Sequence, residues 1–195
     1  MTHDHSKIPD VIRGEEVQAM SFSLDFEKHL FVLPGTHSKW LQTQNGQINW
    51  FSTFMTGDLY AAVLDHTVVS QLHVKEDPAS MDAFELGIQT GYSEHENMLH
   101  LLFGARTKVL FNELKQTEVS DYLSGLLIGM EISSALSTIG IPSSGVELIG
   151  DEGLCERYHR ALQICGIDAC RSDNSRIGTT YVKIAQKAGI IRNTA

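Results

Sequence analysis

Apolar and polar residues follow two different periods along the chain, and the change of period separates predicted strands from predicted helices. The apolar run at residues 29–33 ends at a Pro-Gly pair and predicts a buried strand. Residues 39–43 predict a second strand. Asn45-Gly46 then predicts a tight hairpin turn into a third strand over residues 47–51.

From residue 57 onward the apolar positions recur at helical spacing instead. Predicted helices cover residues 57–66, 80–92, 95–103, 105–114 and 118–139. The last of these is long and central. Its small residues Ser124, Gly125 and Gly129 are spaced so that another backbone can approach closely.

The end of the chain returns to short alternating elements. We predict a strand at 146–149, a helix at 151–165, a strand at 167–170 and a closing helix at 175–188. Strands first, then helices, then strand–helix units indicate an α/β fold: a short mixed sheet with a helical insertion. Residues 1–13 are polar, and no Pro-, Gly- or Ser-rich linker follows, so residues 1–195 are predicted to form a single domain.

Composition narrows the class of protein. The chain of 195 residues has 15 Lys and Arg against 24 Asp and Glu, a formal charge of −9, with 42% hydrophobic residues. Disordered and collagen-like classes do not fit these proportions. The basic residues are scattered, which argues against binding to a nucleic-acid backbone.

The cysteines and the long apolar stretch bear on location. Cys155, Cys165 and Cys170 match no zinc spacing and are predicted to be free thiols in a reducing cytoplasm. Residues 122–140 include Glu131 and favour a buried helix over a membrane span. The terminal His3-Asp4-His5 cluster is not expected to bind a metal, and no secretory signal precedes it.

Two short segments carry candidate chemistry, and the first is Arg13-Gly-Glu-Glu. A short helix is predicted to start at Gly14, because Glu15 and Glu16 occupy its first turn, where the helix dipole favours carboxylates. A carboxylate that follows a flexible glycine can act as a general base. The residues alone favour the alternative, a capping carboxylate with Arg13 as its ion-pair partner.

The second segment is the Pro-Gly-Thr-His turn between the first two strands. At Gly35, Thr36 and His37 the turn leaves backbone N–H groups and a hydroxyl free to surround an anion. The alternative is an ordinary hairpin turn in which Thr36 bonds its own backbone. No P-loop, dinucleotide fingerprint or nucleophile elbow is present in the sequence.

Six blocks, read in order, resemble one family. They are DVIRGEEVQ, LFVLPGTHSKW, FMTGDLYAAVLDH, LFGART, YLSGLLIGMEI and ELIGDEGLCERYHRAL. Together they resemble the 2-dehydro-3-deoxygalactonokinases, from about residue 3 to about residue 165. The blocks are short, but six of them in register make the resemblance specific.

The resemblance implies a fold, an activity and its cofactors. The implied fold is the C-terminal lobe of an actin-like ATPase, or ribonuclease H-like, sugar kinase. The implied reaction transfers the γ-phosphate of ATP, with Mg²⁺, to the 6-hydroxyl of 2-dehydro-3-deoxy-D-galactonate, in the breakdown of D-galactonate. The implied partners are a sugar acid and a nucleotide, without nucleic acid or membrane.

The same resemblance implies roles for individual residues. Glu15 is the candidate base for the sugar hydroxyl, and Glu16 is the second choice. Gly35, Thr36 and His37 resemble a phosphate hairpin, and Gly150 resembles the glycine beside the adenosine. The candidates for binding the sugar acid are Arg13, Arg106 and Ser124. For Arg106, a surface ion pair explains the residue nearly as well as a carboxylate ligand.

The chain also departs from the family pattern. No Asp-x-Gly-Thr strand, the first phosphate motif of these kinases, occurs in the sequence. The resemblance therefore implies the C-terminal lobe without the N-terminal lobe. One hypothesis is a kinase. The other is a non-catalytic module that binds sugar acid or nucleotide, self-associates, or needs a separate N-terminal half.

Overall fold

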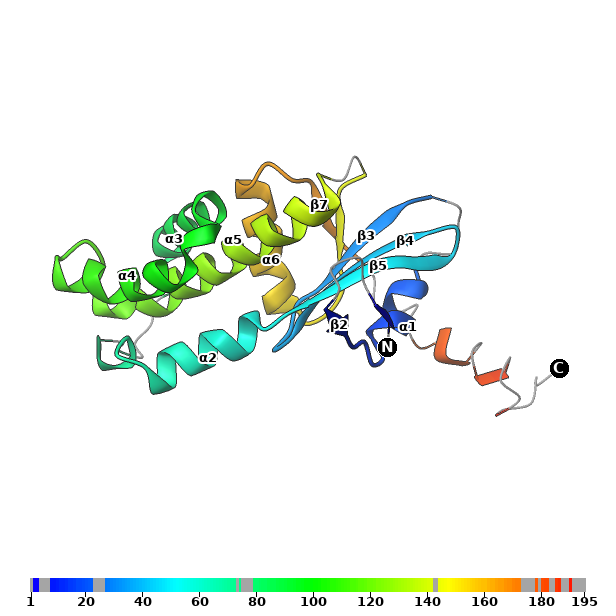
Figure 1. The fold of residues 1–195 in the computed structure, drawn as a ribbon, viewed down its shortest axis with the longest axis horizontal. Helices are drawn as coiled ribbons and strands as arrows, with labels where there is room; N and C mark the ends of the chain where they lie inside the picture. Colours follow the sequence, from blue (N-terminus) through cyan, green and yellow to red (C-terminus); the bar gives the residue numbers. More distant parts are fainter. Residues whose placement is uncertain are drawn as a thin grey trace.

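A mixed five-stranded sheet forms the centre of the fold (Figure 1). The computed structural model describes residues 2–3, 8–22, 27–72, 74, 79–141 and 144–172, with 178, 180–182, 185–186 and 190 near the C-terminus. The strands are β3 (His29–Leu33), β4 (Ser38–Gln44), β5 (Gln47–Phe54), β6 (Val146–Leu148) and β7 (Ala169–Arg171). Their order across the sheet is β5-β4-β3-β6-β7.

The sheet combines an antiparallel half with a parallel half. Strands β3, β4 and β5 run antiparallel in sequence, while β6 pairs parallel with β3 and β7 pairs parallel with β6. Asn45 and Gly46 both have positive φ, 54° and 68°, as the predicted tight turn between β4 and β5 requires. The prediction of a short mixed α/β sheet is confirmed.

Helices connect these strands and cover both faces of the sheet. They are α1 (Glu15–Met20), α2 (Thr56–His66), α3 (Met81–Ser93), α4 (Met98–Leu110), α5 (Val119–Ile139) and α6 (Glu152–Ile164). Single 3₁₀ turns lie at Ser70–Leu72, His95–Asn97 and Gln116–Glu118. In Figure 1, α1 lies on one side of the sheet, and α3, α4 and α5 extend away from the other side.

The two faces of the sheet have separate cores. On the α1 side, Ala19 packs with Phe31, Leu33, Leu41 and Phe51. On the other side, alternate strand residues pack against α3, α5 and α6. The alternation of side chains along β3 and β4 divides the apolar residues between these layers.

Helix α5 organises the helical side, and glycines set its distance from α3. A Cβ on Gly125 would lie 2.0 Å from the Phe84 carbonyl oxygen, and one on Gly91 would lie 2.1 Å from the Leu126 oxygen. Backbone therefore packs directly on backbone, and this confirms the close approach that the sequence predicts at Gly125 and Gly129. The helical region Gln116–Ile139 is long and apolar enough to cross a membrane, but 67% of its most apolar window is buried inside the protein.

The structure corrects two predictions and leaves one outside its range. Residues 95–114 do not form two helical segments, because α4 continues through Gly104 and ends at Leu110, before Asn112 with φ 59°. The polar N-terminal segment, for which the residue pattern predicts no strand or helix, contains β1 (Thr2–His3), and this strand pairs antiparallel with β2 (Pro9–Asp10). The predicted helix at 175–188 falls mostly outside the described residues.

The three cysteines are free thiols, as predicted. Cys155 is buried, Cys165 is partly buried and Cys170 is exposed. Burial raises the pKa of Cys165 to about 12, so this thiol stays protonated and unreactive at neutral pH.

Candidate active site

The turn between β3 and β4 is held from behind by the first turn of α2. A Cβ on Gly57 would lie 2.7 Å from the Cα of Thr36, so only glycine permits this approach. The Asp58 backbone N–H donates to the Thr36 carbonyl oxygen at 3.1 Å. The Asp58 carboxylate pairs with Nε2 of His37 at 2.7 Å. These contacts fix the shape of the Pro34–His37 turn, which we call the phosphate hairpin after the role proposed for it below.

A cavity of about 420 Å³ opens beside the phosphate hairpin, and we call it the hairpin cavity. Its walls come from α1, the hairpin, the start of β4 and the end of β6. They are Glu15, Gln18, Leu33, Pro34, Gly35, Thr36, His37, Lys39, Ile149 and Gly150. Five predicted site residues, Glu15, Gly35, Thr36, His37 and Gly150, are thus brought together from segments far apart in sequence.

A second cavity of about 260 Å³ lies between α2, α5 and α6, and we call it the helix cavity. Most of its walls are apolar. They are Gly35, Thr56, Gly57, Tyr60, Ser124, Leu127, Ile128, Leu154, Arg157 and Tyr158. Gly35 lines both cavities. Ser124, a predicted substrate residue, lies on this second side.

The two glutamates of α1 differ in their access to the hairpin cavity. Helix α1 follows Gly14, whose φ of 106° favours glycine. Oε2 of Glu15 accepts a hydrogen bond from the Arg13 backbone N–H at 2.8 Å, and Oε2 of Glu16 accepts one from Gly14 at 2.6 Å. Both carboxylates therefore cap the helix start, but only Glu15 also lines the cavity. Arg13 is exposed and lines neither cavity.

Gly150 places the start of α6 beside the phosphate hairpin. Its φ of 146° lies in the region that favours glycine, and a Cβ there would lie 3.6 Å from the Pro34 carbonyl oxygen. The next residue, Asp151, caps α6 by accepting a hydrogen bond from the Leu154 N–H at 3.1 Å.

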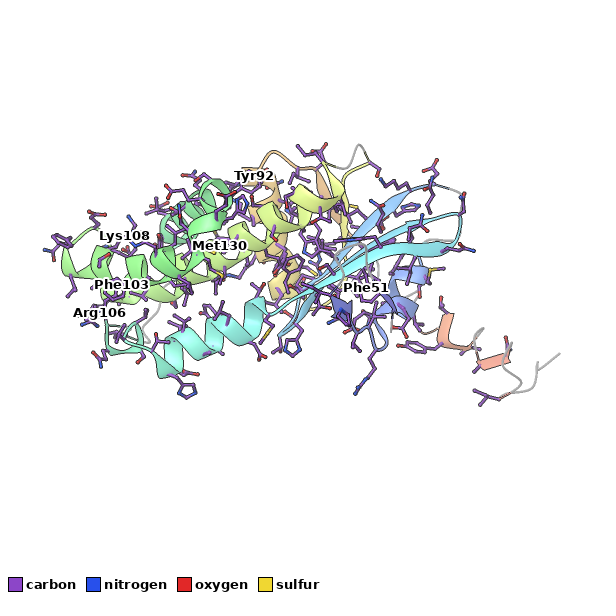
Figure 2. The ribbon with its side chains drawn as sticks, in the orientation of Figure 1. Phe51, Tyr92, Phe103, Arg106, Lys108 and Met130 are labelled. Carbon is purple, nitrogen blue, oxygen red and sulfur yellow. The ribbon has the colours of Figure 1, made fainter. Side chains whose placement is uncertain are left out.

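Arg106 is not brought to these cavities. It lies on α4 at the far end of the helical side, near Phe103 and Lys108 (Figure 2). Its Nη1 donates to the Val68 carbonyl oxygen at 2.8 Å. This guanidinium thus stabilises the helical insertion, and the contact with a sugar acid stays a prediction that its position does not support.

Sequence reasoning missed three polar residues around the cavities. Lys39 lines the hairpin cavity, and Asp58 holds His37. Arg157 lines the helix cavity, lies 4.3 Å from the centre of the Phe84 ring and donates to Asp121 at 2.8 Å. The signal for Lys39 was a lysine at the first position of a predicted strand, directly before Trp40 and Leu41. The other two depend on contacts between distant segments.

A buried carboxylate, Glu131, ties together the elements behind the hairpin. One oxygen accepts a hydrogen bond from Trp40 Nε1 at 2.7 Å. The other accepts from the Tyr158 hydroxyl at 2.7 Å and from the Thr56 hydroxyl. Burial raises the pKa of Glu131, while the hydrogen bonds from these groups oppose that rise. The network links β4, α2, α5 and α6.

The raised pKa of Glu131 predicts a pH-dependent contribution to stability. The folded state keeps the proton in a range where the unfolded state, with an ordinary pKa of 4.5, has lost it. The contribution is therefore full below the unfolded pKa and is lost as pH rises through the folded pKa. We expect the free energy of unfolding of the wild type, relative to Glu131→Gln, to decrease from pH 5 to pH 8. Urea unfolding at both pH values measures this, and a constant difference would contradict it.

No group of three or more metal-binding side chains occurs among the residues that the structure describes. Glu15 is the one carboxylate among the residues that line the hairpin cavity. This donor set fits Mg²⁺ that is carried mainly by the phosphates of a nucleotide, because Mg²⁺ commonly uses few protein carboxylates and keeps several waters.

Comparison with known proteins assigns the family. The model of the 2-keto-3-deoxy-galactonokinase family matches residues 1–181. The chain belongs to this family. Among its relatives, 2-dehydro-3-deoxygalactonokinase of Escherichia coli (strain K12) is 36% identical over 169 residues, which are 86% of this chain and 56% of that protein. A second relative, from Rhizobium meliloti (strain 1021), bears the name of a probable 2-dehydro-3-deoxygalactonokinase. It is 36% identical over 82% of this chain and 53% of the length of that relative.

Solved structures agree with the family and the fold. A crystal structure from Sinorhizobium meliloti that carries the name of the same kinase superimposes with a TM-score of 0.85 at 33% identity, over 95% of this chain and 62% of that one. A second solved structure is the activator of 2-hydroxyisocaproyl-CoA dehydratase from Clostridium difficile with bound ADPNP. It superimposes with a TM-score of 0.51 at 13% identity, which shows a similar fold alone. The chain thus spans about half the length of the curated kinases of its family.

Proposed function

We propose that this chain carries one half of an ATP-dependent sugar-acid kinase site. The reaction would transfer the γ-phosphate of ATP to the 6-hydroxyl of 2-dehydro-3-deoxy-D-galactonate. The single observation that supports this most is the hairpin cavity, in which the carboxylate of Glu15 and the Gly35-Thr36 turn share one space. A phosphate acceptor and a phosphate donor can meet there.

The nucleotide would extend across Gly35. Backbone N–H groups and the Thr36 hydroxyl of the phosphate hairpin would hold its phosphates, as such turns commonly do. The apolar helix cavity would take the adenosine, with Gly150 at the start of α6 close to the hairpin. A structural neighbour with bound ADPNP supports a nucleotide in this fold.

Glu15 would act as the general base. Its carboxylate would accept the proton of the 6-hydroxyl while the hydroxyl oxygen attacks the γ-phosphorus. The bond between the γ-phosphorus and the bridging oxygen would break, and its electron pair would leave with ADP. Mg²⁺ would enter with the nucleotide and neutralise charge on its phosphates.

The chain would correspond to the C-terminal lobe of an actin-like ATPase, and the sheet order β5-β4-β3-β6-β7 supports this. The wall that carries the first phosphate motif, a motif that these 195 residues do not contain, would come from an N-terminal half. As a second candidate function, this lobe by itself would bind nucleotide or sugar acid without turnover. We place either form in the cytoplasm, where ATP is available.

A coupled ATP-turnover assay tests the two functions. The chain is assayed with Mg²⁺ and 2-dehydro-3-deoxygalactonate, alone and with the N-terminal half of a relative added as a separate chain. Turnover in either mixture supports the kinase. Nucleotide binding without turnover in both mixtures, by a folded protein, supports the binding module instead.

We also expect the chain to self-associate. Exposed apolar residues gather on α4 and directly after it, where Leu99, Phe103 and Phe111 are 80%, 50% and 76% exposed. Surfaces of this kind commonly mark contact sites. Sedimentation velocity at increasing concentration should show species larger than a monomer, and Leu99→Lys should reduce them. A monomer at all concentrations would contradict this expectation.

A further inference from the structure

We propose that Lys39 binds the terminal phosphate of the nucleotide in the hairpin cavity and neutralises its charge during transfer. The proposal rests on the proposed function and adds a residue to that site. It starts from an unusual position for a charged side chain. Lys39 is only 6% exposed, although it lies at the edge of a water-accessible cavity.

The sheet directs Lys39 toward the hairpin cavity. Lys39 is the second residue of β4, directly opposite Leu33 of β3 and Thr53 of β5. Side chains that lie opposite one another share a face of the sheet. Leu33 belongs to the core on the α1 side, so Lys39 lies on the face where α1 and Glu15 also lie.

Lys39 has no anionic partner in the part of the chain that the structure describes. No ion pair within 4.0 Å and no side-chain hydrogen bond joins its ammonium group to a described residue. The carboxylate of Asp10 lies near the same strands, but it accepts hydrogen bonds from Thr53 and Val11 instead. Oε2 of Glu15 accepts from the Arg13 backbone.

An ammonium group in this position is costly without a counter-charge. Lysine is almost never fully buried unless it is paired, because removal of the charge from water is unfavourable. An anion that enters the hairpin cavity supplies the missing partner. The three N–H donors of a lysine suit a phosphate, which they bind as a point charge.

The terminal phosphate fits better than the carboxylate of the sugar acid. Lys39 follows Thr36 by three residues and lines the same cavity as Gly35 and Thr36. Any phosphate held by the hairpin therefore lies within reach of a lysine side chain. A cation here would also stabilise the negative charge of the phosphoryl group as it moves toward the sugar hydroxyl.

Binding measurements with three probes separate these possibilities. Isothermal titration with AMP-PNP, ADP and 2-dehydro-3-deoxygalactonate, each with Mg²⁺, is applied to the wild type, Lys39→Met and Lys39→Arg. We expect Lys39→Met to weaken AMP-PNP binding at least about tenfold and ADP binding much less. The AMP-PNP affinity of Lys39→Arg should lie between those of the wild type and Lys39→Met. The matched control is Lys108→Met. Lys108 lies on α4 and pairs with Glu113, so this variant should bind each probe as the wild type does.

A stability measurement shows that Lys39→Met acts on binding and not on folding. Because the substitution removes a buried unpaired charge, its urea midpoint without nucleotide should equal or exceed that of the wild type. Unchanged AMP-PNP affinity, equal losses for AMP-PNP and ADP, or a loss confined to the sugar acid would each overturn the assignment. Absence of AMP-PNP binding by the folded wild type, both alone and with the N-terminal half of a relative added, would overturn the proposed function itself, and this assignment with it.

Discussion

Replacement of Gly125 with alanine is expected to destabilise the protein by about 3 kcal/mol, toward the upper end of typical overpacking costs. The added Cβ would lie 2.0 Å from the Phe84 carbonyl oxygen and 2.9 Å from its carbon. These are backbone atoms of α3, so no side-chain rotation can relieve the contact. The two helices must separate, and their shared core with Ile88 and Ile128 must open. Urea unfolding followed by circular dichroism measures the loss.

Gly104→Ala is the matched control for this prediction. Gly104 also lies inside a helix, α4, but nothing lies within 4 Å of the Cβ that alanine would add. Alanine favours helix over glycine by about 1 kcal/mol, so this variant should be slightly more stable than the wild type. Equal losses for both variants would mean that the contact between α3 and α5 does not limit stability.

The second large effect concerns the proposed base. We expect Glu15→Gln to lower kcat for sugar-dependent ATP turnover at least about 10²-fold, in the range that a general base contributes. Glutamine keeps an oxygen that can accept the hydrogen bond from the Arg13 N–H, so α1 should start as before. The lost function is proton acceptance. Steady-state kinetics with the preparation that shows turnover in the coupled assay measures the effect.

Two further variants make this result specific. Glu16→Gln changes the neighbouring carboxylate, which does not line the hairpin cavity. If Glu16→Gln loses turnover and Glu15→Gln keeps it, the base is Glu16. Glu113→Gln, at the far end of the helical insertion, should leave turnover unchanged. An unchanged rate in both Glu15→Gln and Glu16→Gln would remove α1 from the mechanism.

The strands and the short turns could be predicted well because their signals are local. The Pro-Gly stop and the Asn45-Gly46 turn bound β3, β4 and β5 to within a few residues. The error at α4 has a local cause as well. Gly104 suggested a break, but a glycine without close neighbours is tolerated inside a helix that packs through Ala105.

The candidate site could be predicted only in part. Sequence and resemblance indicated Glu15, the Gly35-Thr36 turn and Gly150, and the fold brings these into one cavity. The resemblance placed Glu15 before Glu16. The fold adds that both cap the same helix start, while Glu15 alone of the two lines the hairpin cavity. Arg106 was selected from a family block, and its block turned out to lie on α4, away from the sheet (Figure 2).

By itself the sequence determined where strands and helices form, the family, and the residue types available for chemistry. Periodicity, turn residues and short motifs are properties of neighbouring residues, so one chain is enough to read them. Tertiary structure alone decided that Lys39 is buried without a partner among the described residues and that Glu131 joins four elements behind the hairpin. Burial and charge pairing depend on segments far apart in the sequence, such as Trp40 and Glu131, which are 91 positions apart, and only the folded chain brings these together.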